Sequence, residues 1–378
     1  MKKKIFVVIT ARPSYSRVKY ALKAIKNHKD LDLTIIASAS AMSEKYGAVV
    51  NDIENDGFFV KYKLNNLSDS NLENNMVETT SFGMKQISEV FLKDRPDAVL
   101  TIADRYETIA TAIAASYMNI PLVHLQGGEN TGSIDNKVRH AITKLSDLHL
   151  ACTNKAKNNI ISMGENPKDV YATGCPSLDL VKDILSSKVK IDLSLLNKNC
   201  NKKIDKIPEE YIIVMQHPDT NFFNQSKQQI CEIIEAILKF DKSIFWFYPN
   251  IDLGSEAIKN ELSLISSHPN IYMFSHIPSM EFIKLLNSTL CLVGNSSVGI
   301  RECSFMGVPV VNIGDRQNNR ERGNNVIDVD YNNQNILDAI EYQIKTKKYP
   351  SNYLYGDGDA GRHIADILAS HNLALKKN

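Results

Sequence analysis

Carboxylates follow two short apolar runs of this sequence, at the points where each run ends. Asp104 comes just after the run from Ala98 to Ile102, and Glu129 follows the run from Leu122 to Leu125 after the pair Gly127-Gly128. If the runs are parallel strands, their carboxyl ends meet at one edge of a sheet, where open α/β proteins bind ligands. Positioned carboxylates at such an edge can remove or deliver protons.

Two further segments carry groups that are suited to proton transfer. Asp135 and Arg139 stand four residues apart in a helix-like run and share one face of it. They fit either a helix start with an ion pair or a catalytic carboxylate with its partner, and the spacing alone leaves both readings open. His217 follows the apolar run from Tyr211 to Met215, and histidine titrates near neutral pH, so it is a candidate acid or base.

Other segments favour the binding of an anion. Arg12 and Ser16 follow the first apolar run, where Pro13 can begin a helix, so they form either an anion site at a helix start or a surface arginine beside a cap. In the second half of the chain, backbone amides and side chains after strand-like runs could hold a diphosphate nucleotide. These candidates are Asn250, Ser296, Ser297, Glu302 and Arg316.

Alternating apolar and helix-like segments must position these groups. The expected strands in the first half are Ile5 to Ile9, Leu33 to Ala37, Ala98 to Ile102, Leu122 to Leu125, Leu148 to Ala151 and Val170 to Ala172. Those in the second half are Tyr211 to Met215, Ile244 to Tyr248, Ile271 to Phe274, Leu290 to Val293 and Val310 to Ile313. Such alternation predicts an α/β protein with two doubly wound parallel sheets.

A Lys- and Asn-rich stretch without periodicity separates the two halves. We therefore expect one Rossmann-like domain over 1–186 and a second over 187–355, facing each other across a cleft. Residues 356–378 contain a terminal helix that could pack back on the first domain. The segment 356–361 satisfies G-x-G-x-x-G but follows no strand, so a turn before that helix is the better interpretation.

Composition excludes several classes of protein. The formal net charge is +1, which gives no reason to expect a nucleic-acid or membrane-surface partner. The six cysteines are scattered without a C-x-x-C pair, which disfavours zinc and redox motifs. The apolar run after the N-terminal lysines is too short for a signal peptide. We expect a cytoplasmic protein that needs no metal and no redox cofactor.

Ordered segments along nearly the whole chain resemble the UDP-N-acetylglucosamine 2-epimerase family, and most closely its hydrolysing branch. That family has a two-domain fold like that of GT-B glycosyltransferases. The matching segments are Asp104-Arg105, Gly127-Gly128-Glu129, Ile134-Asp135, Arg139 to Lys144, Gly174 to Ser177, Gln216-His217-Pro218, Pro249 to Asp252, Gly294 to Ser297 and Gly314 to Gln317.

The resemblance implies elimination of UDP from UDP-N-acetylglucosamine to give 2-acetamidoglucal, followed by addition of water to give N-acetylmannosamine for sialic acid synthesis. It implies catalytic roles for Asp104, Glu129, Asp135 and His217. It implies contacts with the sugar nucleotide from Arg12, Ser16, Arg105, Arg139, Asn250, Ser296, Ser297, Glu302 and Arg316. It also implies a homodimer or homotetramer and no cofactor.

The chain departs from the family pattern in three places. Gln126 stands where many relatives have glutamate, and Ile102-Ala103 replaces the usual His-Gly before Asp104. Asn260 and Ser263 replace the arginines that bind CMP-sialic acid in the animal enzyme, so we expect no inhibition by that route.

Four other functions remain open on the sequence alone. The same hydrolysis could act on UDP-2,4-diacetamido-2,4,6-trideoxyglucose in legionaminic acid synthesis, or the chain could be a non-hydrolysing epimerase. It could also be a retaining glycosyltransferase or a sugar-nucleotide sensor that has lost catalysis.

Overall fold

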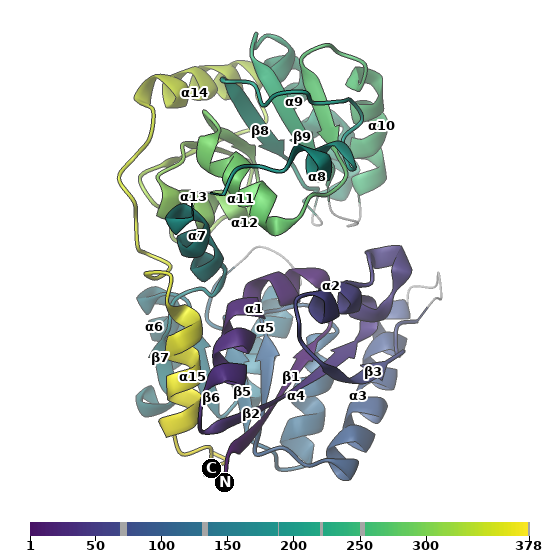
Figure 1. Ribbon diagram of the computed structural model, residues 1–378, viewed down its shortest axis with the longest axis vertical. Coiled ribbons are helices and arrows are strands. Elements are labelled where there is room, and N and C mark those ends of the chain that lie inside the picture. The colour runs from purple at the N-terminus through teal and green to yellow at the C-terminus, as the bar shows by residue number, and fades with distance from the viewer. Residues whose placement is uncertain (69–73, 131–134, 188, 220–221, 250–253, 377–378) are drawn as a thin grey trace. The chain divides into compact units, whose positions relative to one another are not determined.

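The computed structural model describes residues 1–68, 74–130, 135–187, 189–219, 222–249 and 254–376 (Figure 1). The chain divides into two compact units. The first comprises Met1–Glu129, Ile134–Asp179 and Gly356–Asn378, and the second comprises Asn130–Ser133 and Leu180–Tyr355. The division after Asp179 falls inside helix α7 (Ser177–Ser186), whereas the sequence placed it after residue 186.

The first unit contains a parallel seven-stranded sheet in the order β3-β2-β1-β4-β5-β6-β7. Its strands are β1 (Lys3–Ile9), β2 (Leu31–Ser38), β3 (Val60–Leu64), β4 (Ala98–Ile102), β5 (Leu122–Leu125), β6 (Leu148–Ala151) and β7 (Val170–Ala172). Strands β4 to β7 have the bounds that the apolar runs predict, because a buried parallel strand needs apolar side chains on both faces.

Helices cover both faces of this sheet. They are α1 (Arg12–Asn27), α2 (Val49–Asn55), α3 (Asn75–Lys93), α4 (Thr108–Tyr117), α5 (Asp135–Leu145), α6 (Asn154–Ser162) and α15 (Ala360–Ser370), with short 3-10 turns at Ala39–Met42, Glu44–Tyr46 and Pro167–Asp169. Alternate residues of β1 divide between two cores: Val7 packs with α1, α2 and α15, and Phe6 packs with α3, α4 and α5. The first unit is therefore a three-layer α/β/α fold.

The second unit repeats this plan with a parallel six-stranded sheet in the order β10-β9-β8-β11-β12-β13. Its strands are β8 (Tyr211–Met215), β9 (Ser243–Phe247), β10 (Ile271–Phe274), β11 (Leu292–Gly294), β12 (Val310–Ile313) and β13 (Val326–Val329). Its helices are α8 (Leu193–Asn197), α9 (Ser226–Leu238), α10 (Ser255–Ile265), α11 (Ser279–Ser288), α12 (Ser297–Ile300), α13 (Glu302–Met306) and α14 (Asn333–Thr346), besides a 3-10 turn at Phe223–Gln225. No helix in the described ranges is both long enough and apolar enough to cross a membrane.

The terminal helix α15 belongs to the first unit and lies beside α1 (Figure 1). Gly361 allows this close approach, because an added Cβ would lie 2.7 Å from the Tyr20 carbonyl oxygen. The Asp179 carboxylate accepts hydrogen bonds from the amides of Ala360 at 3.0 Å and Gly361 at 2.7 Å, at the start of the helix. The G-x-G-x-x-G segment thus forms the turn into α15 and its first residues, and it precedes no βαβ unit.

Beyond α15 the chain ends against a buried carboxylate. The Glu165 side chain is 2% exposed and accepts hydrogen bonds from Lys144 Nζ at 2.6 Å and from Lys376 Nζ, while His149 Nε2 lies at 3.3 Å. Burial alone would raise the pKa of Glu165, but the hydrogen bonds from His149, Lys144 and Lys376 lower this pKa to about 2. The last described residues therefore help to neutralise a charge inside the first unit.

We predict that Glu165→Gln makes the first unit less stable at pH 7, and that its deficit against wild type shrinks as the pH falls from 5 toward 2. A carboxyl whose folded-state pKa is depressed stabilises the fold above its unfolded-state pKa and loses that contribution as the pH falls through the folded-state pKa. Calorimetric melting at several pH values measures this. Glu209→Gln is the control, because Glu209 is exposed in its pair with Lys206. A constant deficit across this pH range would contradict the prediction.

Candidate active site

Four of the predicted site residues follow strands that adjoin the switch point of each sheet. In the first sheet the strand order reverses between β1 and β4, and in the second it reverses between β8 and β11. Arg12 follows β1, Asp104 follows β4, His217 follows β8 and Ser296 follows β11. Ligands bind at such carboxyl edges in open α/β proteins.

A buried guanidinium organises the carboxylates of the first unit. Arg139, in α5, is 1% exposed, and its Nη2 donates to the carboxylate of Asp104, which is 9% exposed. Its Nη1 donates to the carbonyl oxygen of Glu129 at 2.7 Å and to Asn136 Oδ1 at 3.2 Å. One side chain thus ties the loop after β4, the loop after β5 and helix α5 together.

This arrangement changes the interpretation of Arg139. The resemblance placed it among the groups that contact the sugar nucleotide, but its buried head is committed to protein partners, so we assign it to holding the site together. The ion pair reaches Asp104, which is 35 positions away in the sequence. Asp135 is the first residue of α5, but its side chain lies outside the described part of the chain, as does Asn250.

The loop that carries Glu129 is shaped by close packing. A Cβ on Gly127 would lie 2.8 Å from His124 Nδ1, and one on Gly128 (φ +79°) would lie 2.2 Å from the Ala156 carbonyl oxygen. Asn159 Nδ2 also donates to the Gly128 carbonyl oxygen at 2.9 Å. Because neither glycine has a side chain, the loop can pack closely against β5 and α6. This packing fixes the position of the main chain that leads into Glu129.

His124, inside β5, is a structural residue. It is fully buried, and its Nε2 lies 2.9 Å from the carbonyl oxygen of Ala103, so the proton sits on Nε2 and Nδ1 accepts from Thr143 Oγ1 at 3.1 Å. Burial lowers the pKa of His124 to about 3, against the effect of the Ala103 hydrogen bond. Ala103 has φ +60°, a left-handed conformation that costs an alanine energy, and His124 helps to hold it directly before Asp104.

Arg105 has a partner that the sequence analysis did not single out. Its Nε lies 3.1 Å from Glu107 Oε2, and its Nη2 lies 3.1 Å from Glu107 Oε1. Glu107 is 3% exposed, and Ser40 Oγ lies 3.2 Å from Glu107 Oε1 and 2.9 Å from the Thr10 carbonyl oxygen, so its single hydrogen is shared between these two acceptors. The sequence contained one signal for this ion pair, which was the glutamate two positions after Arg105. Glu107 thus joins Arg105 to the ends of β1 and β2.

Arg12 and Ser16 occupy the first turn of α1. Ser16 is exposed, and its hydroxyl donates to the Pro13 carbonyl oxygen at 3.0 Å. Burial lowers the pKa of Arg12, although the nearby charge of Asp52 acts in the opposite direction. The first turn contains no acidic residue, so the helix start is electropositive. This turn can hold an anion.

In the second unit, His217 is neutral at pH 7. It is 6% exposed, and burial together with the charge of Arg316 lowers its pKa to about 3. This low pKa argues against the ordinary titration of histidine near neutral pH, and a catalytic role of His217 stays a prediction. A neutral imidazole can donate one hydrogen bond and accept another.

The Gly-Asn-Ser-Ser segment leads from β11 into the short helix α12. Ser296 caps α12, since its Oγ accepts from the Val298 amide at 3.4 Å, and Ser297 is the first residue of the helix. Glu302 begins α13 after a break at Arg301. The hydroxyl of Ser296 and the cation of Arg316 therefore lie in two loops that follow the neighbouring strands β11 and β12.

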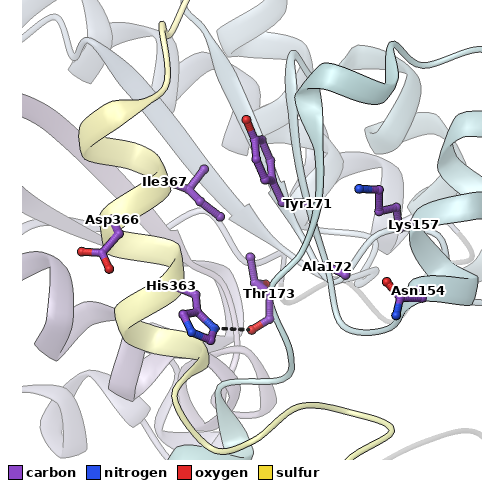
Figure 2. A pocket seen from close by; sticks show the side chains of 8 residues that line it. All are labelled: Asn154, Lys157, Tyr171, Ala172, Thr173, His363, Asp366 and Ile367. Carbon is purple, nitrogen blue, oxygen red and sulfur yellow. Dashed lines mark hydrogen bonds between the residues drawn. The ribbon is translucent and has the colours of Figure 1, made fainter.

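Two other features of the structure add no group to this site. Among the described residues, no cluster of three or more His, Cys, Asp or Glu side chains could hold a metal ion. A hollow of about 430 Å³ lies in the first unit, where His363 Nδ1 of α15 is 3.5 Å from the Thr173 carbonyl oxygen. Figure 2 shows these residues together with Asn154 and Lys157 of α6. None of the predicted site residues lines it.

Comparisons with known proteins give a consistent result. The family model described as UDP-N-acetylglucosamine 2-epimerase matches residues 23–369. A UDP-N,N'-diacetylbacillosamine 2-epimerase (hydrolyzing) of Legionella pneumophila is 33% identical over 384 residues, covering 100% of this chain and 99% of that protein. A UDP-N-acetylglucosamine 2-epimerase of Neisseria meningitidis is 30% identical over 358 residues, covering 94% and 92%.

The fold is shared with a solved structure. The Methanocaldococcus jannaschii UDP-GlcNAc 2-epimerase, crystallised with UDP-GlcNAc and UDP, matches with a TM-score of 0.80 at 21% identity, over 97% of this chain and 99% of that one. The expectation of two Rossmann-like domains of the GT-B type is thus confirmed.

We predict that Gly128→Ala destabilises the first unit more than Gly57→Ala does. Both glycines have left-handed φ, +79° and +83°, so each alanine costs about 1 kcal/mol in backbone energy. Only at position 128 does the new Cβ meet a backbone oxygen, which adds roughly 1–3 kcal/mol of overpacking. Calorimetric melting of the two variants measures the difference in stability. Equal losses of stability would contradict the prediction, because they would show that the loop can shift away from the new Cβ at little energetic cost.

Proposed function

The chain belongs to the UDP-N-acetylglucosamine 2-epimerase family, and from that premise we propose that it is a hydrolysing 2-epimerase. It removes UDP from a UDP-2-acetamido sugar and inverts carbon 2. The full-length match to the Legionella enzyme, whose name specifies hydrolysis, supports the hydrolysing branch. The observation that carries the proposal is the link that Arg139 makes between Asp104 and the Glu129 loop, because the reaction needs carboxylates fixed near a weakly acidic carbon.

The proposed reaction has two stages. A carboxylate removes the proton from C2, the C1–O bond breaks, and UDP leaves with the bonding electron pair, which gives a 2-acetamidoglucal. Water then adds across the double bond: a proton is delivered to C2 from the opposite face, and the hydroxyl joins C1. The products are UDP and the free sugar with inverted C2.

The contacts of the carboxylates suggest separate roles. Asp104 faces the guanidinium of Arg139, which favours the charged carboxylate and makes it a weaker proton acceptor. Arg139 also donates to the main-chain oxygen of Glu129, which fixes the position from which the Glu129 side chain extends. We assign the C2 proton to Glu129 and the orientation of water and sugar to Asp104 and Asp135.

In the second unit, hydrogen bonds and one cation stabilise the leaving group. Neutral His217 donates a hydrogen bond to the departing diphosphate, and Arg316 supplies the positive charge. Ser296 and Ser297 bind phosphate oxygens from the start of α12, and Glu302 binds the ribose. Arg12, Ser16 and Arg105 bind the nucleotide from the first unit.

Two donors are consistent with the comparisons. The 33% identical relative is named for a diacetamido sugar nucleotide and the 30% identical one for UDP-N-acetylglucosamine. The higher identity favours UDP-2,4-diacetamido-2,4,6-trideoxyglucose, the legionaminic-type donor, over UDP-N-acetylglucosamine and sialic acid synthesis. The homodimer or homotetramer stays a prediction.

Proton NMR in deuterated water tests the function. Purified protein is given each donor separately, without added metal or nicotinamide. We expect free UDP and a 2-epimeric sugar that carries deuterium at C2, with faster turnover of the diacetamido donor and loss of turnover in Glu129→Gln. Release of the UDP-linked epimer would indicate the non-hydrolysing reaction. UDP binding without turnover of either donor would leave a sensor as the better description.

We predict that Arg139→Lys lowers turnover by about 100-fold, because a single ammonium cannot reproduce the contacts with Asp104, the Glu129 main chain and Asn136. Steady-state kinetics on the preferred donor measures this. Arg322→Lys is the matched control, since Arg322 forms an ion pair with Asp328 at 2.8 Å on the second unit. Near-normal turnover in Arg139→Lys would show that the charge alone suffices.

A further inference from the structure

In the second unit, the buried side-chain amide of Asn295 forms hydrogen bonds with the main chain of His217. Asn295 is 0% exposed; its Oδ1 accepts the His217 amide N–H at 2.8 Å, and its Nδ2 donates to the His217 carbonyl oxygen at 2.8 Å. The two hydrogen bonds imitate one rung of a β-ladder where β8 has already ended. His217 is thereby held by a side chain from the loop after β11.

The main chain of Asn295 continues the same network. Its amide donates to the Met215 carbonyl oxygen at 3.1 Å, and its carbonyl oxygen accepts from Gln317 Nε2 at 2.9 Å and from Arg316 Nη1 at 3.3 Å. Gly294 permits this approach, because a Cβ there would lie 2.2 Å from the Met215 carbonyl oxygen. Asn295 therefore contacts the segments that follow three adjacent strands, β8, β11 and β12.

The chemistry of the side chain explains why this residue is asparagine. A carboxamide presents one donor and one acceptor in a single plane, which matches the N–H and C=O of one residue. Aspartate has no donor for the His217 carbonyl oxygen, and serine has one short hydroxyl that can replace a single bond. Alanine would leave both main-chain groups without these partners in a buried place, which costs more than the bonds themselves.

We propose that Asn295 is a positioning residue, which holds the His217 main chain and the Arg316 side chain in a fixed relation so that both meet the leaving diphosphate together. This role rests on the proposed function, because it assigns His217 and Arg316 to the departing UDP. Asn295 itself does not touch the substrate. Its effect on the reaction passes through the two groups that it holds.

The test compares Asn295→Ala with Asn325→Ala. Asn325 is 2% exposed and also joins two segments through its amide, with Ser304 Oγ at 2.8 Å and the Val308 carbonyl oxygen at 2.8 Å, but it lies at the amino end of β13. The measurements are the melting temperature, kcat and KM on the preferred donor, and the dissociation constant of UDP. We expect both variants to melt earlier, with kcat about 100-fold lower only in Asn295→Ala and a smaller change in KM.

A second variant covers the case in which Asn295→Ala does not fold. Asn295→Ser retains one of the two hydrogen bonds, and we expect a kcat between those of wild type and an inactive enzyme while Asn325→Ser stays near wild type. Equal kcat in the Asn295 and Asn325 variants would overturn the proposal, because Asn295 would then contribute only stability.

A readout independent of turnover separates this proposal from the proposed function. The imidazole signal of His217, assigned by its loss in His217→Gln, should not titrate between about pH 5 and 8 in the wild type, since burial and Arg316 lower its pKa to about 3. In Asn295→Ala or Asn295→Ser the released His217 segment can reach water and move away from Arg316, so both causes of the low pKa weaken and we expect the signal to titrate in that range. If no donor is turned over, the proposed function fails, and an unchanged His217 signal would then overturn the role of Asn295 as well.

Discussion

The positions of the proposed functional groups depend on the conformation that the chain takes where each buried parallel strand ends. At the carboxyl edge of a parallel sheet the chain must leave the ladder abruptly, yet its main-chain polar groups still need partners. In the first unit, Ala39 after β2 and Ala103 after β4 both take left-handed conformations. Asn66 accepts the Ala39 amide at 2.8 Å, and His124 Nε2 donates to the Ala103 carbonyl oxygen at 2.9 Å. Buried side chains thus stabilise turns that the backbone alone disfavours, and the functional groups begin directly after them.

The two units differ in how they reduce the energetic cost of burying ionisable side chains. In the first unit, the buried carboxylates of Asp104 and Glu107 each pair with an arginine, and each ion pair also bonds to a neighbouring loop. In the second unit, His217 avoids the cost of a buried charge by staying neutral beside Arg316. The first arrangement suits the movement of protons between fixed carboxylates. The second places the positive charge of Arg316 beside a neutral imidazole, which is the combination that the proposed departure of a diphosphate needs.

Sequence reasoning located the central strands and the loops after them, because buried parallel strands leave uninterrupted apolar runs. It missed β3 and β13, two of the four edge strands: Lys61 and Lys63 alternate with Val60 and Tyr62 in β3, and Asp328 interrupts β13, whereas the edge strands β7 and β10 keep apolar runs. Edge strands face water on one side, so they tolerate charge and lose the signal. Contacts between residues that are far apart in the sequence could not be predicted either. The sequence offers Asp135 as the helical neighbour of Arg139, and only the fold brings Asp104 to it.

Gln126 shows how one departure from the family pattern can be accommodated without loss of the site. Its backbone has φ +66°, its side chain is 1% exposed, and its Nε2 donates to Cys175 Sγ at 3.6 Å. A glutamate there, as in many of the relatives that the resemblance brings together, would face this thiol without a donor hydrogen to offer. The amide therefore serves packing inside the first unit and leaves no carboxylate at this position. The proposal that Glu129 takes the C2 proton follows from this difference, because Glu129 is the next carboxylate along the loop.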